Sequence, residues 1–168
     1  SNLLFLRALR DVPARIRRKP HEADFAVFAI FDQTTAVLVD IGANRGQSIR
    51  SIRIFAPTAA IVAFEPNHDL ARYLEARVDD NQTTVHAVGL GAAHGDLTLF
   101  VPKYGHTLYD TRAATEPEQA AEFLSPENFV GFDPERASVV ESRINVRTLD
   151  SFDLTPAAIK IDVEGADL

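Results

Sequence analysis

The chain contains no cysteine among its 168 residues, and it has no long hydrophobic run. The first absence excludes disulfide bonds and metal sites built from thiolates. The second excludes a membrane-spanning helix, which needs about 18 to 20 consecutive apolar residues, and the apolar start at residues 3–6 is too short for the core of a signal peptide. We therefore expect a soluble, cytoplasmic protein that buries one hydrophobic core.

Positive charge is scarce outside the first 19 residues. Residues 1–19 carry six basic side chains and one acidic one, whereas the rest of the chain carries 11 basic and 23 acidic ones. A basic segment can bind nucleic acid or an anionic membrane. Here, however, apolar side chains recur at helical spacing from Leu3 to Ile16, which favours a helix packed on the domain with its arginines in solvent. We expect no nucleic-acid partner and no membrane span, and we assign residues 1–35 to an N-terminal helical segment.

Strand and helix patterns alternate from residue 36 onward. Residues 36–41 form an apolar strand, and a helix with one apolar face follows over residues 46–55. A second helix is predicted after Asn67, a suitable N-cap residue. Further strands are predicted over residues 61–65, 83–88, 97–101, 139–148 and 158–163. This alternation predicts a doubly wound, mainly parallel α/β sheet of the Rossmann-like type.

Residues 102–138 interrupt the alternation. Prolines and glycines break this stretch, and from Thr115 to Glu135 it holds six acidic side chains and no basic one. Long irregular segments inside a compact domain are commonly lids or substrate loops. We interpret residues 102–138 as an insertion of antiparallel or loop structure over one end of the sheet, with an idle solvated loop as the alternative.

The end of the first strand carries the strongest functional signal. The strand runs into the pattern Asp40-x-Gly42-x-Asn44-x-Gly46, after which a helix begins. A helix N-terminus directs unpaired N–H groups toward a ligand above the strand end, and ligands of open α/β sheets bind at the carboxyl ends of the strands. Glu65 ends the second strand, where a carboxylate can accept hydrogen bonds from a ribose diol.

The spacing of the glycines distinguishes two classes of cofactor. Dinucleotide dehydrogenases favour Gly-x-Gly-x-x-Gly, which lets a pyrophosphate approach the backbone. This chain has two glycines in the loop, and Asp40 stands where it would repel a pyrophosphate. An acidic residue suits a ligand with an ammonium group and no phosphate, and S-adenosylmethionine is such a ligand. A nicotinamide-dependent oxidoreductase is the less favoured alternative.

Several motifs, in this order, resemble the FkbM family of S-adenosylmethionine-dependent methyltransferases. They are residues 39–46, 63–66, 95–99, 148–151 and 159–166. The resemblance implies a class I methyltransferase domain over residues 36–168 that transfers a methyl group to a hydroxyl of a small-molecule acceptor, often a sugar or a natural product, and releases S-adenosylhomocysteine. It also implies a set of cofactor-binding residues, which are Asp40, Gly42, Ala43, Asn44, Gly46, Glu65, Pro66 and Val88.

The last predicted strand supplies the candidates for catalysis. Lys160, Asp162 and Glu164 alternate along it and so share one face. Because charges within a sheet are costly unless paired, we expect Lys160 to neutralise one acid while the other serves as a general base; a purely ion-paired strand end is the alternative. Asp162 is the first choice, with Glu164 and His106 as further candidates. Two carboxylates make a weak metal signature, so no metal is predicted.

The resemblance also bears on the end of the chain. Class I methyltransferases have further strands beyond the one that precedes Glu164, so we expect C-terminal strands to be missing from these 168 residues. A cofactor-binding but inactive module, whose basic leading segment or acidic insertion binds a partner protein, is the alternative to an active enzyme. The identity of the acceptor and the oligomeric state are not specified by these patterns.

Overall fold

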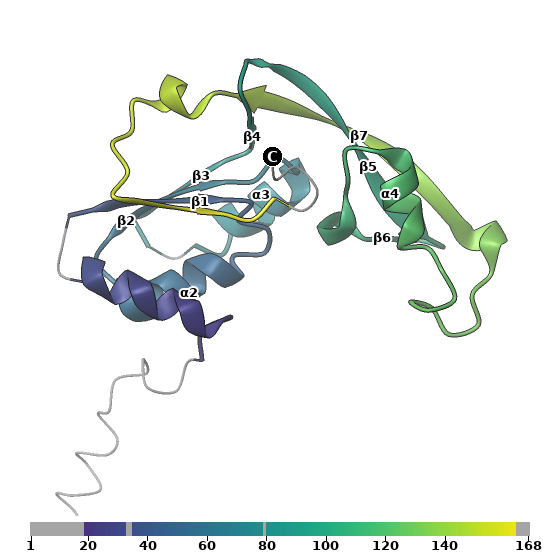
Figure 1. Ribbon diagram of the computed structural model, residues 1–168, viewed down its shortest axis with the longest axis horizontal. Helices are drawn as coiled ribbons and strands as arrows, with labels where there is room; N and C mark the ends of the chain where they lie inside the picture. The colour runs from purple at the N-terminus through teal and green to yellow at the C-terminus, as the bar shows by residue number, and fades with distance from the viewer. Residues whose placement is uncertain (1–18, 33–34, 79, 164–168) are drawn as a thin grey trace, which may run out of the picture.

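The computed structural model describes residues 19–32, 35–78 and 80–163. Two four-stranded sheets make up this part of the chain, with strand orders β3-β2-β1-β8 and β4-β7-β5-β6 (Figure 1). The leading helix predicted within residues 1–16 and the candidate Glu164 lie outside the described residues. Within the described ranges, no helix is long and apolar enough to cross a membrane.

The first sheet is entirely parallel. Its strands are β1 (Val37–Ile41), β2 (Ala60–Phe64), β3 (Thr83–His86) and β8 (Ala158–Ile161). β1 lies between β2 and β8, and the register places Asp40 beside Ala63 on one side and beside Lys160 on the other. The carboxyl ends of parallel strands meet at one edge of a sheet. The mainly parallel sheet predicted from the sequence is therefore confirmed.

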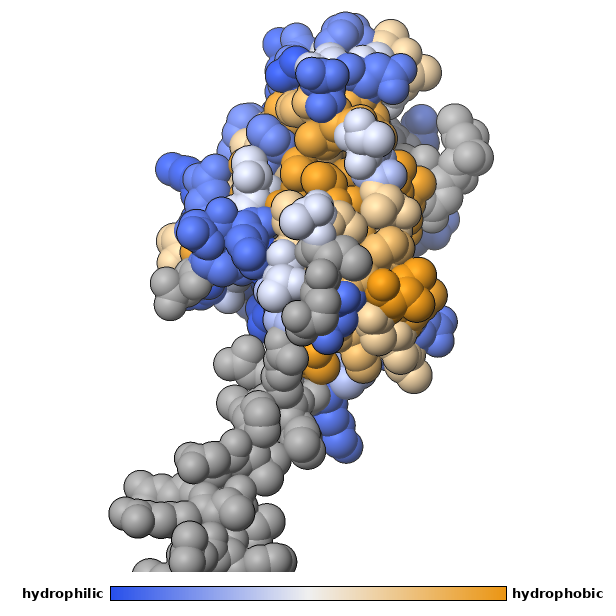
Figure 2. Space-filling view, turned by 90° about the vertical axis from the view of Figure 1, so that its left-hand side faces the viewer, coloured by the Kyte–Doolittle hydropathy of each residue, from blue (hydrophilic) through white to orange (hydrophobic). Residues whose placement is uncertain are grey.

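One face of this sheet carries a small apolar cluster beneath the segment that precedes β8. Val39, Val62 and Phe64 form the cluster, and Phe152 of the short 3-10 helix η5 (Leu149–Phe152) packs against it. The Phe152 ring meets the Phe64 ring edge-on, with centroids 4.8 Å apart. Figure 2, which views the left-hand side of Figure 1, shows apolar surface between hydrophilic groups.

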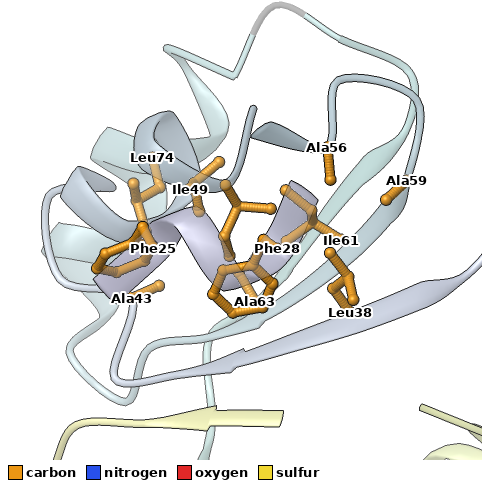
Figure 3. Close-up of a cluster of buried hydrophobic side chains, with 11 residues drawn as sticks. Phe25, Phe28, Leu38, Ala43, Ile49, Ala56, Ala59, Ile61, Ala63 and Leu74 are labelled. Atoms are coloured by element: carbon orange, nitrogen blue, oxygen red, sulfur yellow. The ribbon is translucent and has the colours of Figure 1, made fainter. Parts of the chain in front are cut away.

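The opposite face carries the main hydrophobic core. The 3-10 helix η2 (Ala23–Phe31), α2 (Gln47–Phe55) and α3 (His68–Glu75) contribute to it. The principal buried side chains, most of them drawn in Figure 3, are Phe25, Phe28, Leu38, Ile49, Ile52, Ile61 and Leu74. Full burial of a side chain of this size stabilises the fold by about 1.5 to 3 kcal/mol. The core thus holds α2, and with it the loop that precedes α2, in a defined position on β1.

The second sheet forms an arm that extends away from the first sheet (Figure 1). Its strands are β4 (Gly89–Leu90), β5 (Gly95–Tyr104), β6 (Thr107–Leu108) and β7 (Ala137–Arg147). β5 and β7 pair antiparallel from Gly95 opposite Val146 to Tyr104 opposite Ala137. β4 pairs with β7 in parallel and joins the arm to the end of β3.

This arm corrects the predicted boundaries of the insertion. The insertion was predicted as antiparallel or loop structure over about residues 102–138, and both long strands continue into that range, β5 to Tyr104 and β7 from Ala137. Pro102 does not end β5, although it has no amide hydrogen to donate, and its carbonyl accepts a hydrogen bond from the Tyr109 amide at 2.9 Å. Stacked aromatic rings give the insertion a core of its own. One example is the pair of Tyr104, at the end of β5, and Phe129, whose ring centroids lie 4.3 Å apart. The long antiparallel ladder therefore overrides the local effect of proline.

Within the first sheet, the loop after β1 approaches the end of β8 closely at Gly42. Its φ is +77°, and a Cβ atom built there would lie 2.0 Å from the carbonyl oxygen of Asp162. Gly131, in the insertion, has a φ of +68° with nothing within 4 Å of such an atom. Of these two glycines, Gly42 therefore combines a left-handed backbone with a crowded site, whereas Gly131 has the left-handed backbone alone.

We predict that Gly42→Ala lowers the free energy of unfolding by about 3 kcal/mol or more, because a steric clash adds to the left-handed strain. The matched Gly131→Ala variant should lose about 1 to 2 kcal/mol from the strain alone. Chemical denaturation of the whole chain measures both values. Equal losses for the two variants would contradict the close approach of the loop after β1 to the end of β8.

Candidate functional site

A pocket opens at the carboxyl ends of β1 and β2, and the second sheet covers it. Its polar lining includes Asn44, Glu65, Asn67, Asp110, Thr111 and Asp162. Its apolar lining includes Pro66, Val88, Leu90, Leu97, Leu99, Ile144 and Val146. The polar groups come largely from the loops after β1, β2 and β8, whereas most of the apolar wall comes from the arm. The site therefore exists only where the two sheets meet.

The loop between β1 and α2 is shaped by three residues with positive φ. Gly42, Asn44 and Gly46 have φ values of +77°, +49° and +77°. The first turn of the loop is tied to β2, because the amides of Gly42 and Ala43 both donate to the carbonyl of Phe64, at 3.0 and 3.1 Å. Glycine adopts this conformation at little cost, and asparagine tolerates it better than most residues. The pattern of glycines and Asn44 in the sequence thus specifies the turn.

Glu65 is held at the end of β2 by two backbone amides. Its side chain is buried, with the residue 6% exposed. Oε2 accepts a hydrogen bond from the Asn44 amide at 2.8 Å, and Oε1 accepts one from the Asn67 amide at 2.9 Å. Each carboxylate oxygen keeps a further lone pair for a ligand in the pocket. The structure thus orients Glu65 before any ligand binds.

Burial raises the pKa of Glu65 above its ordinary value of 4.5. The hydrogen bonds from Asn67 and Asn44 oppose this shift, and the nearby carboxylates of Asp40 and Asp110 add to it. The net direction is upward because removing the carboxylate from water outweighs the stabilisation that the two amides provide. A donor supplied by a ligand would favour the charged form of Glu65.

Asp40 is fully buried beside the loop. Its Oδ2 accepts a hydrogen bond from the Ser48 hydroxyl, and its Oδ1 lies 3.0 Å from Lys160 Nζ. Lys160 also donates to the carbonyl of Gly42 at 3.2 Å. Since Asp40 has no exposed surface, its carboxylate organises the loop through Ser48 and Lys160 and has no surface for direct ligand contact.

Lys160 makes the predicted ion pair and a further one that was not predicted. The sequence predicted that Lys160 neutralises an acid on its own strand, and Asp162 Oδ2 lies 3.5 Å from its Nζ. The shorter contact, 3.0 Å, is with Asp40 Oδ1 on the neighbouring strand. The physical reason is the register of β1 and β8, which places Lys160 directly opposite Asp40. Burial then favours the pairing with Asp40, because an unpaired buried carboxylate is costly.

Asp162 lies at the boundary between the pocket and a second cavity. That cavity is lined by part of η2 and by Ser48, Thr111 and Lys160, among others. Gly42, Asn44, Thr111 and Asp162 line both spaces. The side chain of Asp162 is 68% exposed. Its carboxylate is therefore accessible to a ligand that binds at the boundary of the two spaces.

The remaining predicted residues are distributed unevenly. Pro66 and Val88 line the pocket beside Glu65. Ala43 is buried and lines the second cavity, whereas Gly46 lines neither space. His106 is exposed in the turn between β5 and β6. This turn lies at the outer end of the arm, away from the carboxyl ends of β1 and β2 (Figure 1). The ten-residue strand β5 carries it there, whereas the prediction assumed that the whole insertion folds over the sheet.

The polar lining residues that were not predicted as ligand contacts include Asn67 and Asp110. Asn67 was predicted as an N-cap, and this is confirmed, because its Oδ1 accepts from the amides of Asp69 and Leu70 at 2.9 and 3.3 Å. Its Nδ2 also donates to Asp110 Oδ1 at 3.2 Å. Nothing in the local sequence marks Asp110, because its partner lies 43 residues earlier in the chain.

Metal-binding geometry is not found in this site. Among the residues that the structure describes, no group of three or more histidine, cysteine, aspartate or glutamate side chains could hold a metal ion. Several buried acceptors have no hydrogen-bond partner within the described part of the chain, and among them Asn44 Oδ1 belongs to a residue that lines the pocket. Buried polar groups are nearly always hydrogen-bonded, so a donor from a bound molecule would complete this group.

Comparison with known proteins gives one match to a family. The sequence profile described as the methyltransferase FkbM domain matches residues 40–168. No curated protein matches the chain significantly.

Comparison with solved structures gives distant similarities. One is a protein from Anaeromyxobacter dehalogenans assigned as a type II methyltransferase, with 16% identity, a TM-score of 0.33, and coverage of 43% of this chain and 29% of that one. The plantazolicin methyltransferase BpumL in complex with SAH has 17% identity, a TM-score of 0.32, and coverage of 48% and 30%. A protein from Clostridium thermocellum assigned as an rRNA methylase has 12% identity, a TM-score of 0.35, and coverage of 78% and 98%. The chain spans less than a third of the length of the first two proteins.

We predict that Glu65 makes stability depend on pH in the direction set by its raised pKa. The folded chain binds the proton of Glu65 more tightly than the unfolded chain does. The stability that comes from this proton is fully present below the pKa that Glu65 has in the unfolded chain, and it is lost as pH rises through the pKa that Glu65 has in the folded chain. The wild type should therefore gain stability relative to Glu65→Gln as pH falls from 7 toward 4.5, by about 1.4 kcal/mol per unit of pKa difference. Denaturation of both proteins across this range measures the gain, and a constant difference would contradict the assignment.

Proposed function

Because the chain belongs to the FkbM methyltransferase family, we propose that the pocket at the ends of β1 and β2 binds S-adenosylmethionine and that the domain transfers the methyl group to a hydroxyl of a small molecule. Methyl transfer would convert S-adenosylmethionine to S-adenosylhomocysteine.

The observation that carries the proposal is the pair of acceptors that Glu65 and Asn44 present to the pocket. Glu65 is already oriented by two amides and can accept hydrogen bonds from the two hydroxyls of a ribose. Asn44 Oδ1 is buried without a partner among the described residues, and an ammonium group or a hydroxyl would satisfy it. The residues present therefore fit S-adenosylmethionine, which carries both kinds of donor.

The charge around the pocket supports the same cofactor over a dinucleotide. Glu65, Asp110 and Asp162 all line the pocket, and carboxylates repel a pyrophosphate while they attract a cation. Lys160 is engaged with Asp40 and with the carbonyl of Gly42, so it is not presented as a phosphate-binding group. A nicotinamide dinucleotide would meet unfavourable charge in this site.

Different parts of the pocket suit different parts of the cofactor. The apolar wall that includes Val88 and Leu90 offers a surface for the adenine ring. Glu65 would hold the ribose, and Asn44 with Gly42 would lie beside the amino-acid end. Because Gly42, Asn44 and Asp162 border both spaces, the reactive centre would lie at this boundary, with the acceptor entering from the second cavity.

The chemistry needs orientation and removal of one proton. When bound, S-adenosylmethionine supplies a methyl group on a sulfonium, and the carbon–sulfur bond breaks as the new carbon–oxygen bond forms. Asp162 would accept the proton that the acceptor hydroxyl loses in this step. Lys160, 3.5 Å from Asp162 Oδ2, restrains that carboxylate. Alignment of the hydroxyl with the methyl group supplies the remaining acceleration.

We predict that the wild-type chain binds S-adenosylhomocysteine with micromolar or tighter affinity and that Glu65→Ala weakens binding about 10- to 100-fold. This factor corresponds to hydrogen bonds made to a charged group, each worth about 1.5 to 3 kcal/mol. Isothermal titration calorimetry measures it, with Glu75→Ala, an exposed change at the end of α3, as the control. Undiminished binding by Glu65→Ala, or stabilisation by NAD instead, would overturn the cofactor assignment.

We predict that Asp162→Asn lowers kcat about 100-fold or more, because general-base catalysis contributes a factor of about 10² to 10⁴. The same substitution should change the affinity for S-adenosylhomocysteine less than about threefold. Transfer of isotopically labelled methyl groups to a panel of hydroxylated sugars and related small molecules measures kcat. His106→Ala, at the end of the arm, should retain full activity. Tight cofactor binding without transfer to any acceptor would indicate an inactive cofactor-binding module.

A further inference from the structure

The insertion contributes a residue to the pocket that the sequence did not identify. We propose that Asp110 is a cofactor-binding residue, which accepts a hydrogen bond from a donor of the adenosine half of S-adenosylmethionine and is positioned for this by Asn67. This inference rests on the proposed function. It assigns to the insertion a direct part in recognition of the cofactor.

Asn67 joins the three parts of the pocket. Its backbone amide donates to Glu65 Oε1 at 2.9 Å, and its side-chain Oδ1 caps α3. Its Nδ2 donates to Asp110 Oδ1 at 3.2 Å. An aspartate at position 67 could cap the helix equally well, but its side chain has no N–H to donate and would repel Asp110. Asparagine is therefore required for the bond to the insertion, whereas capping alone would accept several residue types.

The segment that carries Asp110 is anchored on both sides. Before it, the Tyr109 amide donates to the carbonyl of Pro102 at 2.9 Å. After it, Phe100 and Ala114 exchange two backbone hydrogen bonds, of 2.8 and 3.0 Å. Asp110 itself begins the short helix η3 (Asp110–Arg112). The position of Asp110 is therefore defined by β5 as well as by Asn67.

Asp110 retains an acceptor for a ligand. Oδ1 is used by Asn67, whereas Oδ2 has no partner among the residues that the structure describes. Asp110 and Glu65 line the same pocket, and the charge of Asp110 raises the pKa of Glu65. Two neighbouring carboxylates repel each other, so a ligand that brings several hydrogen-bond donors relieves this cost.

Adenosine brings such donors in the ribose hydroxyls and the exocyclic amine. Glu65 can accept from the ribose diol. Asp110 lines the same pocket and is hydrogen-bonded to Asn67, two residues beyond Glu65. A carboxylate oxygen at this place can accept either from the exocyclic amine or from a ribose hydroxyl. The common chemistry is a neutral N–H or O–H donor of the nucleoside, and ligand analogues can distinguish the two groups.

The test measures ligand affinity by isothermal titration calorimetry with the whole chain. Asp110→Asn keeps an oxygen for Asn67 but replaces the free acceptor with an amide, and we expect about 10-fold weaker binding of S-adenosylhomocysteine. Asp96→Asn is the matched control, because Asp96 is an exposed acid of β5 that does not line the pocket, and it should bind as the wild type does. Asn67→Asp should weaken binding similarly while the cap keeps the thermal unfolding temperature close to that of the wild type.

Analogues of S-adenosylhomocysteine identify the donor. S-inosylhomocysteine lacks the amine, and the 2′-deoxy and 3′-deoxy forms each lack one hydroxyl. The 10-fold penalty of Asp110→Asn should disappear with the analogue that lacks the donor and persist with the others. A penalty of the same size with every analogue, or no penalty with S-adenosylhomocysteine, would overturn the assignment of Asp110 and leave the proposed function intact. Absence of binding by the wild type would instead overturn the proposed function together with this inference.

Discussion

The buried ion pair between Asp40 and Lys160 is the interaction on which the site depends. An isolated carboxylate in the core would cost several kcal/mol, and here both oxygens of Asp40 are engaged, by Lys160 and by Ser48. The same ammonium group holds the carbonyl of Gly42 and lies near Asp162. Lys160 of β8 thus contacts both β1 and the loop between β1 and α2, so the loop geometry follows from charge neutralisation as well as from glycine.

A second network joins the first sheet to the arm. The backbone N–H groups of Asn44 and Asn67 donate to the two carboxylate oxygens of Glu65, and the side chain of Asn67 donates to Asp110. The apolar wall of the pocket comes largely from strands of the arm, so the second sheet is part of the site. In the residues described, neither sheet would enclose a ligand alone. Recognition of a nucleoside cofactor is accordingly proposed as a property of the junction between the sheets.

Local patterns predicted much of this arrangement. The parallel sheet, the helix after Gly46 and the cap at Asn67 follow from apolar periodicity, glycine and hydrogen-bonding side chains, all of which act over a few residues. The end of β5 did not follow from local patterns, since pairing with a distant strand carried β5 past Pro102. The location of His106 at the end of the arm has the same origin, because strand pairing across some 40 residues leaves no short-range signal.

By itself, the amino-acid sequence determined the strand-loop-helix unit around Gly42 and Gly46, the acid at the end of β2 and the family to which the chain belongs. Only the tertiary structure decided that Lys160 pairs with Asp40, that Asp40 has no surface for a ligand, and that Asp110 lies beside Asn67. The physical reason is that backbone conformation depends on near neighbours, whereas strand register and burial bring distant charges together and select which of them must pair.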